Sequence, residues 1–284
     1  MISGSCLCRA VAWEIDGPLQ WMSHCHCSRC RKAHGAAFVT YSAANAADFR
    51  FVRGSERIGR YESSPGFFRP FCSQCGSVVP GDPWGPLVFV PAGCLDGELG
   101  VKPEMHIFVS AKPPWVELND ALPRFDGYPP GFEAPATLAE LPERTPYAGK
   151  PRGSCLCGAV AYVVEGAPLR WWFCHCGRCR KARGAACASN LFTAADGVRF
   201  VRGEDRTAAY KIPEAQFFRQ VFCRTCGSAV PNVDPARNVA VIPAGTLDDD
   251  PGFRPQAHIF VGSKATWDDI HSALPQYPGP PPSP

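Results

Sequence analysis

Cysteine motifs occur twice along this chain of 284 residues, at a nearly constant separation. A Gly-Ser-Cys-Leu-Cys run fills residues 4–8 and returns 149 residues later at 153–157. A Cys-His-Cys-x-Arg-Cys-Arg-Lys-Ala run begins at Cys25 and, with the same offset, at Cys174. A Phe-Cys-x-x-Cys-Gly-Ser run follows with an offset of 151, and the Pro-Ala-Gly and His-Ile-Phe-Val motifs with one of 152. Because this drift is small, the chain is predicted to contain two domains of one fold rather than a solenoid.

The segments between and after the repeats are rich in proline. Residues 126–150 contain five prolines and no cysteine, which predicts a linker between a first domain at 1–125 and a second domain at 151–275. Residues 276–284 are predicted to form a disordered tail. We expect the two domains to pack as a pseudo-twofold pair, as two subunits would.

Short strands are expected in both domains. Proline and glycine together supply 57 of the 284 residues, which disfavours long helices and favours strands joined by turns. Runs rich in β-formers at 10–15, 50–53 and 87–90, with counterparts in the second copy, indicate strands. One or two helical turns are expected at 28–37 and 177–186. The fold class is therefore predicted to be mainly β, in two small domains.

Composition narrows the classes of function. A net charge of +3 gives no electrostatic reason to expect nucleic acid or an acidic membrane as a partner. No apolar run reaches the roughly 18 residues that a membrane-spanning helix needs. We expect no signal peptide, and hence a cytoplasmic location, because the first residues lack a basic region followed by an apolar one. In a reducing compartment the sixteen cysteines are more often metal ligands than disulfide partners.

Each copy contains a Cys-x-Cys pair and a distant Cys-x-x-Cys-Gly turn that can bind one ion together. Residues two apart on a strand face the same side, and the Cys-x-x-Cys turn directs two thiolates at one ion. Four sulfurs close a zinc tetrahedron, so we predict one structural zinc site per domain, tying the first strand to a distant hairpin. The alternative is a set of ordinary buried cysteines. The predicted ligands are Cys6, Cys8, Cys72 and Cys75, and Cys155, Cys157, Cys223 and Cys226.

The remaining Cys-x-Cys-x-x-Cys motif supplies three thiolates per domain. Three ligands leave a fourth position open, which is typical of catalytic zinc, and a thiol bound there would be held as the nucleophilic thiolate. The alternatives are a second structural zinc with a histidine as fourth ligand, or an idle thiol cluster. The predicted ligands are Cys25, Cys27 and Cys30, and Cys174, Cys176 and Cys179.

Basic and imidazole side chains near these motifs are substrate-binding candidates. Cations would offset the negative charge of a three-thiolate zinc and could pair with substrate carboxylates. The alternative, which is commoner for such runs of charge, is that they lie on the solvated surface. His106 and His258 lie in a strand-like run, where core histidines are commoner than ligand-binding ones. His26 and His175 stand between ligands and could equally point away into hydrogen bonds. The candidate cations are Arg29, Arg31, Lys32, Arg178, Arg180 and Lys181.

Taken in order, these motifs resemble the glutathione-dependent formaldehyde-activating enzyme / centromere protein V family. The resemblance rests on G-S-C-L-C-G-A-V, C-H-C-x-R-C-R-K-A-x-G, F-C-x-x-C-G-S, P-A-G-T-L-D and H-I-F-V, and it covers about residues 3–125 and 152–275. It implies a β-tent fold with two zinc ions per domain, one structural and one catalytic, on the two cysteine sets above. The second copy matches better, because Gly158 and Thr246 replace Arg9 and Cys94.

The resemblance implies an activity, the addition of glutathione to formaldehyde to give S-hydroxymethylglutathione. The reverse reaction breaks a carbon–sulfur bond, as a carbon–sulfur lyase does, and the partners would be a small-molecule thiol and an aldehyde. Family resemblance is a weaker guide to substrate than to fold. The second interpretation is a non-catalytic zinc-binding scaffold or interaction module. About four zinc ions per chain would favour the enzyme, and about two the scaffold.

Overall fold

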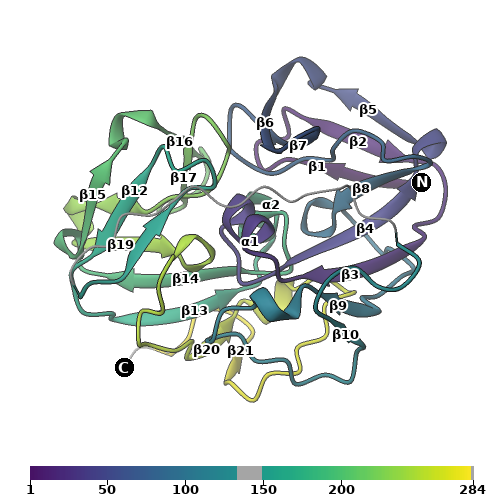
Figure 1. Cartoon of the computed structure of the whole chain (residues 1–284). Helices are drawn as coiled ribbons and strands as arrows, with labels where there is room; N and C mark the ends of the chain where they lie inside the picture. The colour runs from purple at the N-terminus through teal and green to yellow at the C-terminus, as the bar shows by residue number, and fades with distance from the viewer. Residues whose placement is uncertain (133–148, 283–284) are drawn as a thin grey trace.

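The computed structural model describes residues 1–132 and 149–282, and it confirms a mainly β chain built from two similar halves. Figure 1 shows the first half in purple and blue and the second half from teal to yellow, with one short helix from each half lying between them. The elements of the second half follow in the same order as those of the first, with the short strand β18 (Asn232–Asp234) and the 3-10 helix after it added.

The first half forms short strands and one α-helix, α1 (Ser28–His34). Its strands are β1 (Ile2–Ser5), β2 (Ala12–Ile15), β3 (Trp21–Cys25), β4 (Val39–Asn45), β5 (Phe49–Arg53), β6 (Ile58–Ser64), β7 (Phe67–Cys72), β8 (Leu87–Pro91), β9 (Met105–Ile107) and β10 (Arg124–Phe125). Its 3-10 helices are η1 (Ala46–Asp48), η2 (Ser55–Arg57), η3 (Ala92–Cys94) and η4 (Val109–Ala111).

The second half repeats this set around the helix α2 (Gly177–Arg183). Its other strands are β11 (Arg152–Ser154), β12 (Ala161–Val164), β13 (Arg170–Cys174), β14 (Ala188–Thr193), β15 (Val198–Arg202), β16 (Thr207–Lys211), β17 (Arg219–Cys223), β19 (Val239–Pro243), β20 (Ala257–Ile259) and β21 (Gln276–Tyr277). Its 3-10 helices are η5 (Ala195–Gly197), η6 (Glu204–Arg206), η7 (Pro235–Arg237), η8 (Ala244–Thr246) and η9 (Val261–Ser263).

Each half folds into two sheets and a hairpin. In the first half, β1-β2-β5 form a three-stranded sheet, β10-β9-β3-β4-β8 form a five-stranded sheet, and β6 pairs with β7. The second half has β11-β12-β15, β16-β17 and the six-stranded order β18-β19-β14-β13-β20-β21. Strand β9 lies parallel to β3, with Cys25 opposite Ile107. This pairing brings the cysteine at the end of β3 next to the distant His-Ile-Phe motif.

The Cys-x-Cys-x-x-Cys motif ends a strand and begins a short helix. Cys25 is the last residue of β3, and Cys27 is the N-cap of α1, where its Sγ accepts a hydrogen bond from the N–H of Cys30 at 3.3 Å. The helix ends at Gly35, whose φ of 63° is left-handed and therefore suits glycine. The helical turns expected here are thus present. A bilayer-spanning helix is absent from the described residues, in which both α-helices have seven residues.

Each half contributes side chains to the core of the other. Ala265 and Trp267, from the second half, are buried in the core of the first. Trp115 and Val116, from the first half, are buried in the core of the second, where the rings of Trp115 and Trp171 lie 4.8 Å apart. The two cores therefore form together, although each domain is continuous in sequence.

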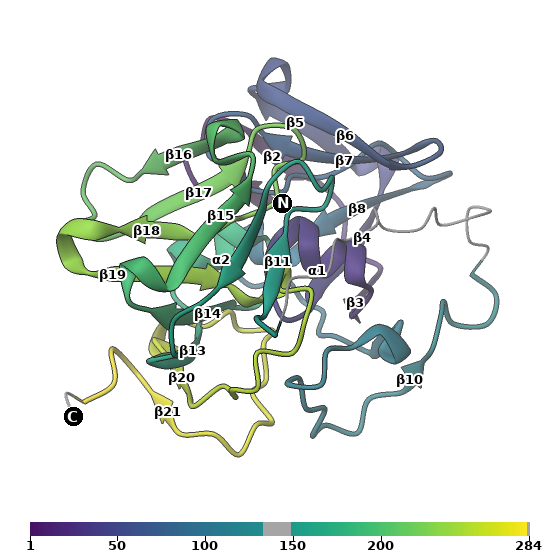
Figure 2. The same cartoon turned by 60° about the vertical axis from the view of Figure 1, so that its left-hand side comes forward.

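Contacts around the two helices are reciprocal, which supports the expected pseudo-twofold pair. Lys32 of α1 forms an ion pair with Asp248 of the second half at 2.5 Å. The equivalent Lys181 of α2 forms one with Asp96 of the first half at 2.9 Å. Figure 2, turned by 60° from Figure 1, also shows α1 and α2 between the halves. The helices thus join the halves as well as carrying cysteines.

The segment predicted as a disordered tail is ordered where the structure describes it. Strand β21 lies parallel to β20, and the carbonyl of Gly279 accepts a hydrogen bond from the N–H of Phe260 at 3.0 Å. The pairing with β20 satisfies backbone N–H and C=O groups of the tail, and a proline-rich composition gives no sign of such pairing. The prediction of a disordered tail was therefore wrong for residues 276–282. The last two tail positions, 283–284, lie outside the described residues.

The predicted linker also begins as part of the first half. After β10, the carbonyl of Gly127 accepts a hydrogen bond from the N–H of Phe108 at 3.4 Å. Tyr128 and Phe132 then stack with ring centroids 4.8 Å apart. The structured part of the first half therefore extends beyond the predicted boundary at residue 125, and residues 133–148 of the predicted linker lie outside the described residues.

Candidate metal centres and active site

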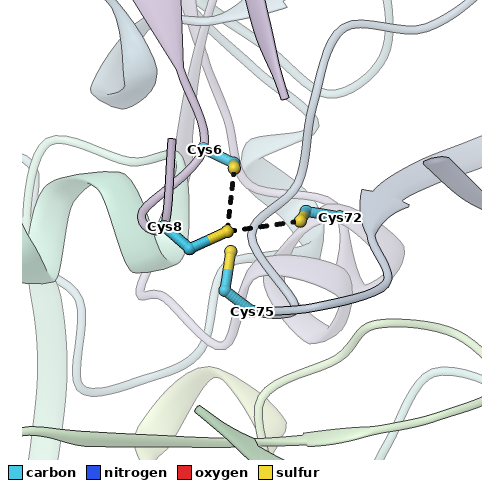
Figure 3. Close-up of side chains that lie close together, drawn as sticks. All are labelled: Cys6, Cys8, Cys72 and Cys75. Atoms are coloured by element: carbon cyan, nitrogen blue, oxygen red, sulfur yellow. Dashed lines mark hydrogen bonds between the residues drawn. The ribbon is translucent and has the colours of Figure 1, made fainter. Parts of the chain in front are cut away.

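The Cys-x-Cys and Cys-x-x-Cys motifs meet in each half as a cluster of four thiols whose sulfurs all lie within 4.8 Å of one another. Figure 3 shows the first cluster, with its side chains directed at a common centre. Cys8 Sγ lies 3.5 Å from Cys6 Sγ and 3.7 Å from Cys72 Sγ. The residues of the two clusters are Cys6, Cys8, Cys72 and Cys75, and Cys155, Cys157, Cys223 and Cys226.

Local geometry fixes the Cys-x-x-Cys turn. Gly76 follows the turn with a φ of 73°, and its N–H donates to the carbonyl of Cys72 at 2.8 Å. A Cβ at Gly76 would lie 2.4 Å from the ring of Phe222 in the other half. Glycine is therefore required both by the left-handed backbone and by the contact between the halves. The N–H of Val11 completes the arrangement by donating to Cys6 Sγ at 3.3 Å.

These four-thiol clusters fit a zinc ion. Zinc–sulfur bonds of about 2.3 Å in a tetrahedron place sulfurs about 3.8 Å apart, and four of the sulfur–sulfur separations are 3.5–3.8 Å. Hydrogen bonding to Cys72 and Cys75 raises the pKa of Cys6 far above its usual range, whereas hydrogen bonding to Cys6 lowers the pKa of Cys75. Thiolates this close repel one another, and a divalent cation would remove the repulsion. Four sulfur donors favour zinc, in a closed and hence structural site.

The remaining motif cysteines form a cluster of three thiols in each half, again with sulfurs within 4.8 Å of one another. Among the described residues, no histidine or carboxylate joins either set. Three convergent sulfurs fit zinc with one coordination position left for another ligand. The residues are Cys25, Cys27 and Cys30, and Cys174, Cys176 and Cys179.

A cavity of about 380 Å³ lies over the first three-thiol cluster, and all three of its cysteines line the wall. Arg69 and Glu104 are the charged side chains among the described lining residues. Most of the rest are apolar, and the segment predicted as linker supplies two of the rings. The aromatic lining residues are Trp21, Tyr41, Phe67, Phe68, Trp84, Phe89, Phe108, Tyr128 and Phe132.

Arg69 places a cation beside the first three-thiol cluster. Its Nη1 donates to Cys30 Sγ at 3.3 Å, and its guanidinium lies over the ring of Phe67, 5.0 Å from the centroid. Burial lowers the pKa of Arg69, but the neighbouring Cys30 and Tyr41 raise it by more, so the guanidinium stays charged. Arg69 can therefore offset the negative charge of thiolates, a role that the sequence analysis gave to the helix cations.

A tyrosine–histidine pair stands on the same wall. Tyr41 lines the cavity, and its hydroxyl donates to Nε2 of His34 at 2.8 Å. The Nδ1–H of His34 donates to the carbonyl of Arg183 in the other half at 2.5 Å, which fixes this tautomer. Burial raises the pKa of Tyr41 and lowers that of His34 to about 4, so both groups are neutral at pH 7. The Tyr41 oxygen keeps lone pairs with which it can accept a hydrogen bond from a ligand.

The wall beside the second three-thiol cluster has a large ring where the first half has a small side chain. Trp172 stands where the first half has Ser23, and its ring packs against the cluster that contains Cys174. The guanidinium of Arg170 lies 4.9 Å from the ring centroids of both Trp172 and Phe192. These three side chains form a stack on the same sheet face as Cys174.

The polar residues around the second three-thiol cluster differ as well. Gln220 stands where the first half has Arg69, and its Oε1 accepts a hydrogen bond from Arg183 at 3.0 Å. Asn190 stands where the first half has Tyr41. The second half therefore lacks the tyrosine–histidine pair, since Arg183 itself occupies the position of His34.

The predicted histidines lie behind the three-thiol clusters rather than in them. The Nε2–H of His106 donates to Asp120 at 2.9 Å, and Nδ1 of His106 accepts from Nε2 of His26 at 2.8 Å. His26 therefore points away from the thiols into a hydrogen bond, which is one of the two possibilities that the sequence left open. His106 is not among the described residues that line the cavity. The second half has a buried chain with the carboxylate at the other end, because Asp268 lies 3.0 Å from Nδ1 of His175, whose Nε2 lies 2.9 Å from Nδ1 of His258.

The predicted helix cations serve mainly the contact between the halves, and none is among the described residues lining the cavity. Arg31 donates to the carbonyls of Gly245 at 3.1 Å and Leu247 at 3.0 Å. Arg29 donates to the carbonyl of Ser63 at 3.4 Å. The two lysines form the ion pairs between the halves described above, and Arg178 is exposed. A substrate-binding role for the six cations, Arg180 included, stays a prediction.

Sequence reasoning missed Arg69, Tyr41 and His34. The repeat itself contained a signal, because each of these positions differs in chemical type between the copies. These differences between the copies do not by themselves indicate a site, because Arg69 lies on a hairpin far along the chain from Cys30.

Comparisons with known proteins find one family in both halves, and two similar proteins are among the matches. A family model described as glutathione-dependent formaldehyde-activating enzyme matches residues 1–111 and again residues 150–263. A curated relative, an uncharacterized lyase of Schizosaccharomyces pombe, is 32% identical over 76 residues, which are 27% of this chain and 53% of the relative. The chain thus spans about half the length of that relative. A solved structure of a Rhodobacter sphaeroides protein matches with 27% identity over 37% of this chain and 97% of its own, with a TM-score of 0.29.

Proposed function

This chain belongs to the glutathione-dependent formaldehyde-activating enzyme family, and on that premise we propose that it is a zinc-dependent carbon–sulfur lyase acting on a glutathione-type thiol adduct. Such an enzyme adds a thiol to an aldehyde and, in reverse, cleaves the carbon–sulfur bond. The observation that carries the proposal is that Cys25, Cys27 and Cys30 line a cavity of about 380 Å³. The lyase name of the yeast relative supports the same reaction class.

The residues around the first three-thiol cluster suit this chemistry. Zinc bound by the three cysteines would hold a substrate thiol as the thiolate at neutral pH. Arg69, which donates to Cys30, balances the charge of the ligands. The apolar walls exclude water, which would compete with sulfur for the aldehyde carbon. Tyr41 can accept a hydrogen bond from the hydroxyl of the adduct and so orient its carbon–oxygen bond, while His34 holds the Tyr41 ring in place.

Replacing Cys27 and Cys176 together with serine is expected to abolish turnover of glutathione with formaldehyde and to leave the fold intact, because the structural clusters remain. The rate is measured by NMR exchange between free and thiol-bound aldehyde, and the fold by circular dichroism. Elemental analysis is expected to find about four zinc ions in the unaltered chain and about two in the variant. Replacing Cys72 or Cys223 with serine should instead unfold the chain, since a closed site loses a ligand and the two cores form together.

The matched control is Cys94→Thr. Cys94 is a buried cysteine outside all four clusters, and threonine is the residue at the equivalent position of the second half, Thr246. This variant should change neither zinc content nor rate. An unchanged rate in the double serine variant would refute the catalytic assignment. About two zinc ions in the unaltered chain, with freely titrating Cys-x-Cys-x-x-Cys thiols, would favour a non-catalytic zinc module instead.

A further inference from the structure

The cavity over the first three-thiol cluster is much larger than formaldehyde requires. Its volume of about 380 Å³ falls in the range of about 300–1,000 Å³ typical of sites for drug-sized ligands. Formaldehyde is little larger than a water molecule, whose share of liquid volume is about 30 Å³. An aldehyde of that size would leave most of the apolar space without a partner.

The walls suit a ring or a branched apolar group. Trp21 and Phe89 have ring centroids 5.7 Å apart, and Phe67 and Trp84 have theirs 6.0 Å apart, in tilted arrangements that leave faces and edges for a further ring. Glutathione has two carboxylates and one ammonium group. The described charged groups of the lining are Arg69, which already contacts Cys30, and Glu104. The cavity therefore matches the aldehyde-derived part of an adduct better than the peptide part of the thiol.

The wall beside the second three-thiol cluster is built differently. Ser23 lines the cavity of the first half, whereas Trp172, at the equivalent position, packs against the second three-thiol cluster. The Trp172 ring also contacts Phe192, with ring centroids 5.4 Å apart, and the guanidinium of Arg170, which lies 4.9 Å from the Trp172 centroid. Trp172 thus puts a ring beside Cys174 where the first half has a small side chain beside Cys25.

We propose that the cavity over Cys25, Cys27 and Cys30 takes the apolar, ring-sized aldehyde part of a thiol adduct, and that the second half, with Trp172 beside Cys174, does not. The inference rests on the proposed function for the chemistry at sulfur. A sulfur lone pair forms the bond to the carbonyl carbon, the π pair of the carbonyl moves to oxygen, and the thiol proton ends on that oxygen. The reverse step releases thiol and aldehyde, and neither direction needs an oxidant or a reductant.

The test uses the full, zinc-loaded chain with glutathione and either phenylacetaldehyde or formaldehyde, and NMR exchange gives the catalysed rate. Ser23→Trp, which copies the second half into the first, is expected to lower the rate with phenylacetaldehyde at least about tenfold and the rate with formaldehyde much less. Phe132→Ala, at the half-buried rim of the cavity, should raise the KM for phenylacetaldehyde several-fold. The reciprocal variant Trp172→Ser, which removes the ring beside Cys174, should lower neither rate. Zinc content and circular dichroism verify that each variant is folded.

Binding of 2-phenylethanethiol, followed by quenching of tryptophan fluorescence, separates this inference from the proposed function. Turnover of formaldehyde alone, without binding of the aromatic thiol, would overturn the inference and leave the proposed function in place. Binding that Ser23→Trp prevents, without turnover of either aldehyde, would support the cavity assignment and overturn the proposed function. An unchanged phenylacetaldehyde rate in folded Ser23→Trp, or a lowered one in Trp172→Ser, would contradict the asymmetry between the halves.

Discussion

Arg9 occupies a backbone position that suits glycine. Its φ is 60°, and the equivalent Gly158 has a φ of 73°. A left-handed backbone costs a residue with a Cβ roughly 1 kcal/mol or more. The Arg9 side chain is exposed, and the carbonyls of both residues accept equivalent hydrogen bonds, from Arg53 and Arg202 at 2.7 Å each. Arg9→Gly is therefore expected to raise the free energy of unfolding by about 1 kcal/mol in urea titrations.

The reverse change, Gly158→Arg, is the matched control and should lower the free energy of unfolding by a similar amount. A shift of both variants in the same direction would show that backbone strain is not the cause. The zinc content should be unchanged in both, because neither side chain is a ligand.

At the residue scale, the sequence predicts ligands well and their neighbours poorly. Cys6 and Cys8 were assigned to one ion, although they lie in the turn after β1 and not on a strand, so the strand periodicity used for them was wrong. The Cys-x-x-Cys turn is a local property that the sequence does predict. Arg69 and Tyr41 could not be assigned, because their place beside the thiols depends on which strands pair. The cations of α1 illustrate the same limit, since Arg31 follows a ligand in sequence yet points into the other half.

At the element scale, α1 and α2 carry equivalent ion pairs in different surroundings. The side chains of Lys32 and Asp248 are 1% and 4% exposed, whereas those of Lys181 and Asp96 are 18% and 51% exposed. Removing one partner of a buried pair leaves an uncompensated charge, at a cost of about 3–5 kcal/mol, whereas an exposed pair contributes about 0–1 kcal/mol. Lys32→Met is expected to cost about 3 kcal/mol or more and Lys181→Met about 1 kcal/mol or less, both measured by urea unfolding. Equal losses would show that burial does not set the difference.

Helices and strands were predictable from the sequence where their own residues favour them, and not where they depend on pairing with a distant strand. The helical turns after Cys25 and Cys174 and the strands near residues 50–53 and 87–90 were expected from composition and turn residues. Strands β10 and β21 were not, because each is two residues long and exists through parallel pairing with β9 or β20. The proline-rich sequence around β21 led to its prediction as a disordered tail, whereas β10 lies at the end of the predicted first domain.

At the scale of the whole molecule, the exchange of core side chains predicts that the halves unfold as one unit. Trp267 belongs to the second half in sequence and is 3% exposed in the core of the first, and Trp115 makes the reciprocal contact. Truncating a buried tryptophan costs about 3–5 kcal/mol. Trp267→Ala and Trp115→Ala should therefore each shift a single urea transition that coincides by fluorescence and far-ultraviolet circular dichroism. Two separate transitions, or a variant that moves one probe and not the other, would mean that the halves are stable independently. Coincident transitions would mean that neither half has a complete core of its own. The second half would then be needed for the stability of the first, whatever its own three-thiol site does.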